Sequence, residues 1–194
     1  MTNYLENLDD KFNERVQEVF KDPYLFDFMT YQEDIIEKQV EDSLVANVTK
    51  LLMELGKGFA FVGRQHKLIV GSEEFFIDLL FYNIDLSCYV VIELKTKKFK
   101  PEYTGKLSFY LSAVDGLLKK ETDNPTIGIL LTRGKDSLVA EFALKQTGAP
   151  IGVADYKFMN EIPEYLGEIL PSIEEIEKHL IDRITDDGSN EDED

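Results

Sequence analysis

Two apolar segments that lie close together in the sequence constrain the fold of this chain most. Residues 75–82 and 89–95 are rich in β-branched, aromatic and aliphatic side chains, which is typical of buried strands. Each segment nevertheless carries formal charge, Asp78 in the first and Glu93 and Lys95 in the second. Charge placed beside an apolar core costs desolvation free energy unless something compensates it. We expect a bound divalent metal to be the compensating partner.

The spacing of these charges predicts where their side chains point. Glu93 and Lys95 are two positions apart, so in a strand they share one face. If the two strands pair, Asp78 joins them. Two carboxylates and one ammonium at one spot are the minimum set for metal-assisted phosphodiester hydrolysis. The structural alternative is an ordinary ion pair between Glu93 and Lys95 at an exposed strand end.

These residues suit a site for Mg²⁺, with Mn²⁺ as a substitute. Mg²⁺ prefers few protein carboxylates and keeps several waters, so Asp78 and one oxygen of Glu93 suffice. The backbone carbonyl of Leu94 lies between Glu93 and Lys95 and is expected to add a ligand. Lys95 is then expected to orient the attacking water or to stabilise the developing charge.

A third carboxylate is expected from the first long helix, predicted over residues 33–55. Its candidates, Glu41 and Glu54, differ by about 220° around a helix. Glu41 shares the direction of the apolar stripe and is expected to reach the site, whereas Glu54 is expected to face water. Alternatively, Glu41 is only a first-turn carboxylate that favours the helix dipole.

Five further residues are candidates for binding substrate: Arg64, Gln65, Lys97, Lys106 and Tyr110. Arg64 and Gln65 end the first predicted strand, and an exposed strand end explains them equally well. Lys106 and Tyr110 are one helical turn apart, although Tyr110 alternatively packs in the core. Lys97 belongs to a group of lysines that suits a polyanionic substrate or, equally, a solvated surface.

Hydrophobic periodicity predicts an α/β fold. The order is a helix, three strands, a helix, a strand, a helix and a strand. Their expected ranges are 33–55, then 59–64 extended or followed by 67–70, 74–82, 88–95, 101–119, 127–132, 137–145 and 151–156. Short turns join the first three strands as antiparallel hairpins, and the fourth follows a crossover helix. A mixed β-sheet flanked by helices on both faces is therefore expected.

Four regions are predicted along the chain. Residues 1–30 form an N-terminal helical lead-in with a helix over 5–20, and residues 31–160 form the core. Residues 161–184 form a C-terminal helical extension, and the acidic tail 185–194 is expected to be disordered.

Composition narrows the classes of protein. A net charge of −17 argues against a nonspecific nucleic-acid coat protein. No apolar run approaches the roughly 20 residues of a membrane span, and the N-terminus lacks the basic and apolar regions of a secretory signal. The single cysteine, Cys88, lies in an apolar strand and is expected to be a buried thiol. We therefore expect a cytoplasmic protein without a membrane partner.

Several runs of this sequence resemble a known family. Ile77-Asp78 is followed fifteen residues later by Glu93-Leu94-Lys95, the pattern of the PD-(D/E)XK nuclease superfamily. More narrowly, the chain is similar to the YhcG-type nucleases of bacteria, over about residues 20–180. The runs that carry this likeness are 54–65, 76–82, 91–95, 99–103, 109–115 and 123–128.

The resemblance implies a restriction-endonuclease-like core with the order αβββαβαβ and a Mg²⁺-dependent DNA endonuclease, acting in DNA repair, recombination or restriction. It implies Asp78, Glu93 and Lys95 as the catalytic set, with Glu41 as the helix carboxylate. This chain departs from the family at Lys106, where relatives tend to carry glutamine.

Relatives also usually carry a further N-terminal DNA-binding-like domain, of which residues 1–22 hold at most the trailing edge. A partner protein that targets the chain to DNA is therefore expected, as is a homodimer, since cutting two strands often needs two sites. The alternative is a catalytically inactive nuclease-fold module that binds nucleic acid or protein.

Overall fold

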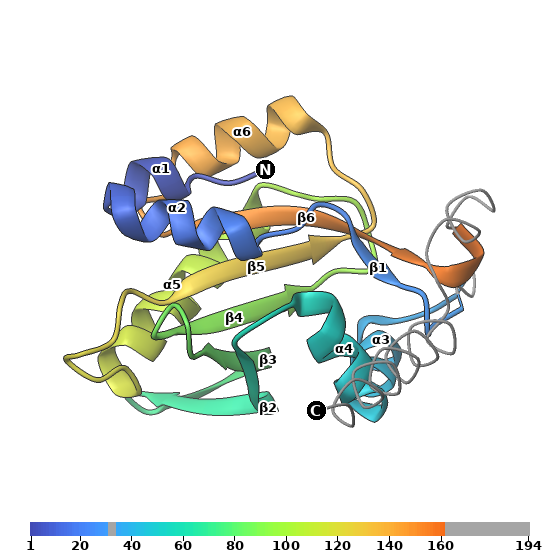
Figure 1. Ribbon diagram of the computed structural model, residues 1–194, viewed down its shortest axis with the longest axis horizontal. Coiled ribbons are helices and arrows are strands. Elements are labelled where there is room, and N and C mark those ends of the chain that lie inside the picture. The colour runs from blue at the N-terminus through green and yellow to red at the C-terminus, as the bar shows by residue number, and fades with distance from the viewer. Residues whose placement is uncertain (31–33, 162–194) are drawn as a thin grey trace, which may run out of the picture. The chain divides into compact units, whose positions relative to one another are not determined.

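A six-stranded sheet forms the centre of the computed structural model, which describes residues 1–30 and 34–161 (Figure 1). The strands lie in the order β1-β6-β5-β4-β3-β2. They are β1 (Tyr24–Phe26), β2 (Phe59–Val70), β3 (Glu73–Asn83), β4 (Cys88–Leu94), β5 (Ile127–Thr132) and β6 (Ile151–Phe158). The pairs β2–β3 and β3–β4 are antiparallel, whereas β4–β5, β5–β6 and β1–β6 are parallel. The predicted α/β class with a mixed sheet is confirmed.

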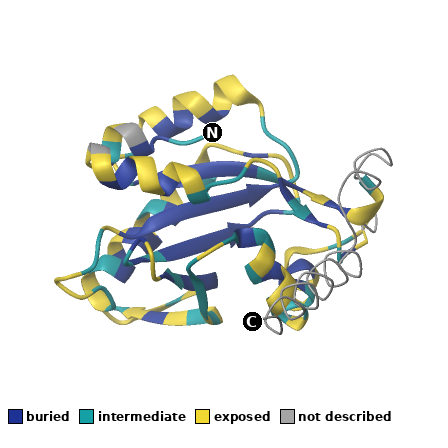
Figure 2. Ribbon diagram, viewed as in Figure 1, coloured by how far each residue is buried: buried dark blue, intermediate teal, exposed yellow. Residues whose placement is uncertain are grey.

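Helices cover both faces of this sheet. They are α1 (Tyr4–Asn7), α2 (Asp10–Val19), α3 (Glu37–Ala46), α4 (Val48–Leu55), α5 (Glu102–Leu117) and α6 (Ser137–Lys145), with a 3₁₀ turn over Met159–Glu161. One apolar cluster packs the four helices α1, α2, α3 and α4 on one face of the sheet. A second cluster packs α5 and α6 on the other face. All residues of β5 are buried, as expected for a strand covered on both faces (Figure 2).

The register of β3 and β4 positions the charged residues. The two strands pair from Asn83 with Cys88 to Leu79 with Ile92. The next position along each strand is Asp78 on β3 and Glu93 on β4. Both carboxylates therefore lie at the point where this antiparallel pairing ends. Cys88, at the opposite end of the pairing, is fully buried, as predicted.

One strand prediction needs correction, and another is confirmed in its longer form. The aromatic segment after Pro23 is a strand, β1, which pairs in parallel with β6 and makes the sheet six-stranded rather than five-stranded. Three residues are too few to show a strand period. The first long strand is continuous over Phe59–Val70, with a register shift between Phe61 and Gly63.

Two helix predictions also need correction. The helix expected over 33–55 is two helices, because Asn47 leaves helical geometry with φ −113° and ψ 37°. Residues 34–36 precede the first of them and are not helical. The helix expected over 5–20 breaks at Leu8, and Asp9 starts α2 by accepting a hydrogen bond from the Phe12 N–H.

Residues Met1–Met159 form one compact unit. The N-terminal stretch 1–30 holds α1, α2 and β1. The predicted helical extension 161–184, apart from its first residue, and the acidic tail 185–194 lie outside the described residues. Within the described ranges, no helix has both the length and the apolarity needed to cross a membrane.

Candidate active site

Asp78 and Glu93 are brought together where β3 leaves β4. The Asp78 carboxylate accepts a hydrogen bond at Oδ2 from the backbone N–H of Leu94, 2.9 Å away. Leu79 is the last β3 residue that pairs with β4, so this side chain continues the ladder where the backbone pairing stops. The bond fixes Asp78 against the strand that carries Glu93.

The Glu93 side chain is 1% exposed and lies between two ammonium groups. Its Oε2 accepts a hydrogen bond from Lys106 Nζ at 2.8 Å, and Lys95 Nζ lies 3.8 Å from the same oxygen. Its Oε1 is buried and has no hydrogen-bond partner among the described residues. Burial and the negative charge of Asp78 raise the pKa of Glu93 to about 7, against the opposing effect of Lys106 and Lys95.

Lys95 is held by contacts on three sides. Its Nζ donates to the carbonyl oxygen of Leu94 at 2.7 Å and to Glu37 Oε2 at 3.1 Å, and it lies 5.6 Å from the ring centroid of Tyr103. The Leu94 carbonyl, which the sequence predicts as a metal ligand, is thus occupied by an ammonium group.

Glu37 is a site residue that the sequence analysis missed. It lies one turn before Glu41 on α3, and residues four apart share a helix face. That spacing is the one signal that could have identified it. Its side chain is 46% exposed, so its ion pair with Lys95 lies at the rim of the site.

Glu41 reaches the site through Gln65. Gln65 Nε2 lies 2.5 Å from Glu41 Oε2 and 3.5 Å from Asp78 Oδ1, so the amide bridges the two carboxylates. The left-handed backbone of Gln65, with φ 43°, turns this side chain out of the regular strand alternation. Glu41 is 4% exposed; burial raises its pKa, with the Gln65 bond opposing and Asp78 adding to the rise.

A cavity of about 520 Å³ opens beside these carboxylates. Its lining is mostly charged and consists of Glu37, Lys38, Glu41, Asp42, Arg64, Gln65 and Asp78. Arg64 forms an ion pair with Asp42 across its mouth. Arg64 and Gln65 were expected at a strand end, but β2 runs through them to Val70 because the chain kinks at Gln65 without breaking the strand.

The remaining substrate-binding candidates differ in their placement. Lys106 is half exposed, and its Nζ lies 5.0 Å from the ring centroid of Tyr110. Tyr110 is 3% exposed and donates its hydroxyl to the Phe76 carbonyl at 2.8 Å, which matches its core alternative. Lys97 is exposed in the loop after β4.

The expectation that Glu54 faces water is wrong. Its side chain is 20% exposed, accepts a hydrogen bond from the Leu25 N–H at 2.9 Å and pairs with Lys21. The angle of about 220° between Glu41 and Glu54 assumes one continuous helix over residues 33–55. The helix breaks at Asn47, so this angle does not apply. In addition, β1 packs beside α4 and supplies the Leu25 N–H that donates to Glu54.

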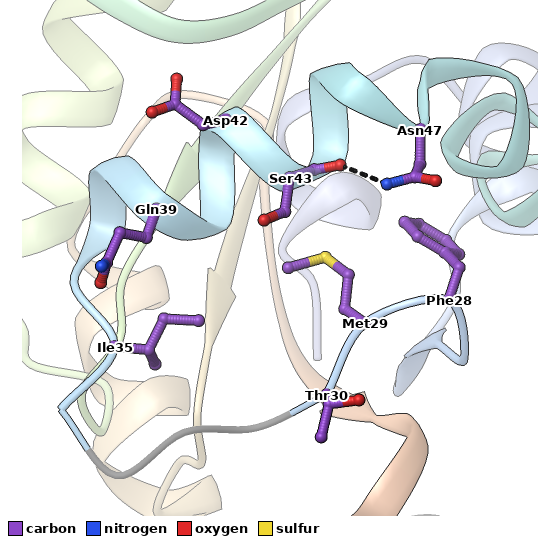
Figure 3. A pocket seen from close by; sticks show the side chains of 8 residues that line it. All are labelled: Phe28, Met29, Thr30, Ile35, Gln39, Asp42, Ser43 and Asn47. Carbon is purple, nitrogen blue, oxygen red and sulfur yellow. Dashed lines mark hydrogen bonds between the residues drawn. The ribbon is translucent and has the colours of Figure 1, made fainter.

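A second cavity, of about 460 Å³, lies beside α3 and α4 and shares Asp42 with the first (Figure 3). Phe28 and Met29 line it together with Ser43 and Asn47, and the Asn47 amide donates to the Ser43 carbonyl at 2.9 Å. Its described lining holds one carboxylate, Asp42. It is therefore distinct from the carboxylate cluster around Asp78.

The donor set fits a hard cation that keeps most of its waters. Within residues 1–30 and 34–161, no three His, Cys, Asp or Glu residues form a group that could enclose a metal. Mg²⁺ does not need one, because it commonly binds through one or two carboxylates. The unpartnered Glu93 Oε1 and the loosely contacted Asp78 Oδ1 are two such oxygens. The Leu94 carbonyl accepts a hydrogen bond from Lys95 Nζ at 2.7 Å, so a metal ion at this oxygen would lie beside that ammonium group.

A family model and a known protein both match this sequence. The family model for the YhcG PDDEXK nuclease domain matches residues 17–171. The YhcG protein of Escherichia coli (strain K12), a candidate nuclease by name, is 30% identical over 148 residues. The match covers 76% of this chain and 39% of that protein, so the chain spans less than half of its relative.

Two solved structures with a similar chain path are as follows. A repair endonuclease from Pyrococcus abyssi is 20% identical with a TM-score of 0.43, over 66% of this chain and 49% of that one. EndoMS in complex with double-stranded DNA is 19% identical with a TM-score of 0.44, over 67% of this chain and 48% of that one.

Proposed function

Because the chain belongs to the family of YhcG PDDEXK nuclease domains, we propose that it hydrolyses phosphodiester bonds in DNA with the help of a divalent metal ion. Mg²⁺ is the proposed metal, and Mn²⁺ is a substitute. The observation that carries this proposal is the meeting of Asp78, Glu93 and Lys95 at the end of the β3–β4 pairing, with one buried Glu93 oxygen left unpartnered.

Asp78 and Glu93 are the proposed protein ligands, with the Leu94 carbonyl as a further ligand once Lys95 releases it. When bound, the metal would supply Lewis-acid polarisation of the phosphate and a more acidic water. Lys95 would then be free to orient that water or to stabilise negative charge on the phosphate. Glu41 acts through Gln65, whose amide holds the position of Asp78.

Three cations are the proposed phosphate contacts, and one of them, Arg64, lines the cavity. Arg64 and Lys106 are about half exposed beside the carboxylates, and Lys97 is exposed in the loop after β4. Contacts from Lys and Arg to phosphate fix the position of a strand without reading its sequence. Tyr110 is proposed to contribute indirectly, because its hydroxyl already bonds to Phe76 and its ring lies against Lys106.

The setting of this activity is also a proposal, since the chain spans 39% of its relative. We propose a role in DNA repair, recombination or restriction in the cytoplasm. A homodimer and a partner protein that targets DNA are the proposed assemblies.

One observation favours a second function, a nuclease fold that binds nucleic acid or protein without cutting. Lys106 and Lys95 occupy Glu93 Oε2 and the Leu94 carbonyl, so two ammonium groups sit where a metal would bind. An inactive module would keep this internally neutralised arrangement.

A cleavage assay separates the two functions. Purified protein is incubated with duplex, single-stranded and branched DNA, with Mg²⁺, with Mn²⁺ and with EDTA. We expect metal-dependent cleavage that Asp78→Asn, Glu93→Gln and Lys95→Ala each lower by about 100-fold or more. Glu102→Gln removes a carboxylate that is 67% exposed and paired with Lys100, and should leave cleavage unchanged.

Two results would count against the proposal. Cleavage that survives both Asp78→Asn and Lys95→Ala would reject the assigned site. Tight DNA binding without metal-dependent cleavage of any substrate would favour the noncatalytic module.

A further inference from the structure

Lys106 forms the shortest contact to Glu93 in the described part of the site. Its Nζ is 2.8 Å from Glu93 Oε2, and the carboxylate is almost completely buried. The ammonium group also lies over the Tyr110 ring at 5.0 Å, which restricts where it can move. Lys106 is therefore a fixed positive charge on one of the two oxygens that Glu93 could offer to a metal.

Lys106 is also well suited to stay charged. Its ammonium group lies 2.8 Å from the negative charge of a carboxylate that is 1% exposed, and this contact favours the charged form of the lysine. A divalent ion that binds Glu93 must therefore approach a carboxylate that an ammonium ion already holds. A metal ion and an ammonium group bound to the same carboxylate would repel each other, because they would lie only a few ångströms apart.

We propose that Lys106 competes with the divalent metal for Glu93, so that the metal reaches this carboxylate only through Oε1 and binds more weakly than it would beside a neutral residue. This inference rests on the proposed function, because it takes Asp78 and Glu93 as the metal ligands. It makes Lys106 a positioning residue that sets the metal concentration at which the site fills.

The test is a Mn²⁺ titration by isothermal calorimetry on the whole chain, without DNA. Lys106→Met removes the competing charge and keeps most of the apolar stem that lies on Tyr110. We expect the Kd for Mn²⁺ to fall by roughly tenfold or more in Lys106→Met and in Lys106→Gln. Lys106→Arg keeps the cation, and its Kd should stay close to that of the wild type.

Lys38→Met is the matched control for net charge. Lys38 is exposed and lines the same cavity as Asp78, but it does not contact Glu93. Its removal should change the Kd much less than removal of Lys106, because an exposed cation is screened by solvent and salt. Circular dichroism of each metal-free variant checks that it is folded, and Lys106→Gln replaces Lys106→Met if the latter does not fold.

The outcomes separate this inference from the proposed function. If Mn²⁺ requires Asp78 and Glu93 but binds the wild type as tightly as Lys106→Met and Lys106→Gln, the role of Lys106 is rejected and the metal site stands. An equal gain in affinity in Lys38→Met also rejects it, because net charge alone then explains the effect. If Mn²⁺ binds Asp78→Asn and Glu93→Gln as tightly as the wild type, the proposed metal site itself fails. It also fails if Mn²⁺ does not bind the wild-type protein.

Discussion

The side chain of Asp78 accepts a hydrogen bond from the backbone N–H of Leu94 at 2.9 Å, just past the last residue pair of the β3–β4 ladder. One carboxylate oxygen is therefore used structurally, while Oδ1 faces the Gln65 amide at 3.5 Å. The same residue both closes the end of the ladder and offers an oxygen to the site.

Asp78→Asn should separate these two roles. Asparagine can keep an acceptor for the Leu94 N–H, so the free energy of unfolding without metal should change by less than about 1 kcal/mol. The substitution removes the negative charge, so the increase in Tm that Mg²⁺ causes in the wild type should disappear. Thermal denaturation with and without Mg²⁺ measures both. Asp78→Ala is the companion variant, and it should lower stability further because the Leu94 N–H loses its partner.

Glu93 should make stability depend on pH. Its pKa is raised by burial to about 7, above the ordinary value of 4.5, so the folded protein binds more protons than the unfolded chain between these values. Without metal, its contribution to the free energy of unfolding should therefore fall as pH rises from about 4.5 to about 7, and then level off. Glu93→Gln should remove this part of the slope.

Urea unfolding at pH 5 and pH 7.5 in EDTA measures this effect, as the difference between wild type and Glu93→Gln at each pH. Glu102→Gln serves as the control, because its carboxylate is exposed beside Lys100. A wild-type curve whose pH slope matches that of Glu93→Gln would contradict the raised pKa.

Glu54 should matter for stability rather than for chemistry. It accepts from the Leu25 N–H at 2.9 Å and thereby ties α4 to β1. Glu54→Ala leaves that partly buried N–H without an acceptor and should lower the free energy of unfolding by about 1–2 kcal/mol. Glu54→Gln keeps an acceptor and should cost less. Chemical denaturation of the two variants tests this order, and an equal loss in both would assign the effect to the ion pair with Lys21 instead.

The contrast between Glu54 and Glu93 shows what sequence reasoning can reach. The sequence predicts residues 89–95 as one strand, so local geometry alone predicts that Glu93 and Lys95 share a face, although β4 itself ends at Leu94. The role of Glu54 depends on a break at Asn47 and on a three-residue strand from another part of the chain. Neither the break nor the short strand gives a periodic signal in the sequence.

The same limit applies within the site. The meeting of Asp78 with Glu93 follows from pairing two apolar strands, which the sequence indicates. The ion pair between Glu37 and Lys95 and the bridge from Gln65 to Glu41 depend on how α3 docks and on the left-handed backbone at Gln65. Neither the ion pair nor the bridge can be predicted from helical or strand periodicity in the sequence.

Cys88 should be unreactive in the folded protein. Its side chain is fully buried, and burial raises the pKa of its thiol to about 12, with the charges of Asp115 and Asp123 adding to the rise. Since the thiolate is the reactive form, a thiol reagent such as DTNB should label it at pH 8 only as fast as the protein unfolds. Labelling should become complete in denaturing urea. Rapid labelling under native conditions would show that the β3–β4 end opposite the site opens locally.

Glu37 should affect the site without stabilising the fold. Its ion pair with Lys95 is 3.1 Å long, but Glu37 is 46% exposed, so Glu37→Gln should change the free energy of unfolding by less than about 1 kcal/mol. The substitution leaves a neutral amide oxygen in place of the carboxylate, so Lys95 Nζ loses the charge that attracts it and its position beside Glu93 loosens. If Lys95 acts on the attacking water, Glu37→Gln should lower kcat by roughly 3- to 10-fold while leaving the Mn²⁺ affinity unchanged. Glu141→Gln breaks a comparably exposed ion pair, with Lys145, and should change neither value. An altered Mn²⁺ affinity in Glu37→Gln would instead mean that Glu37 acts on the metal and not through Lys95.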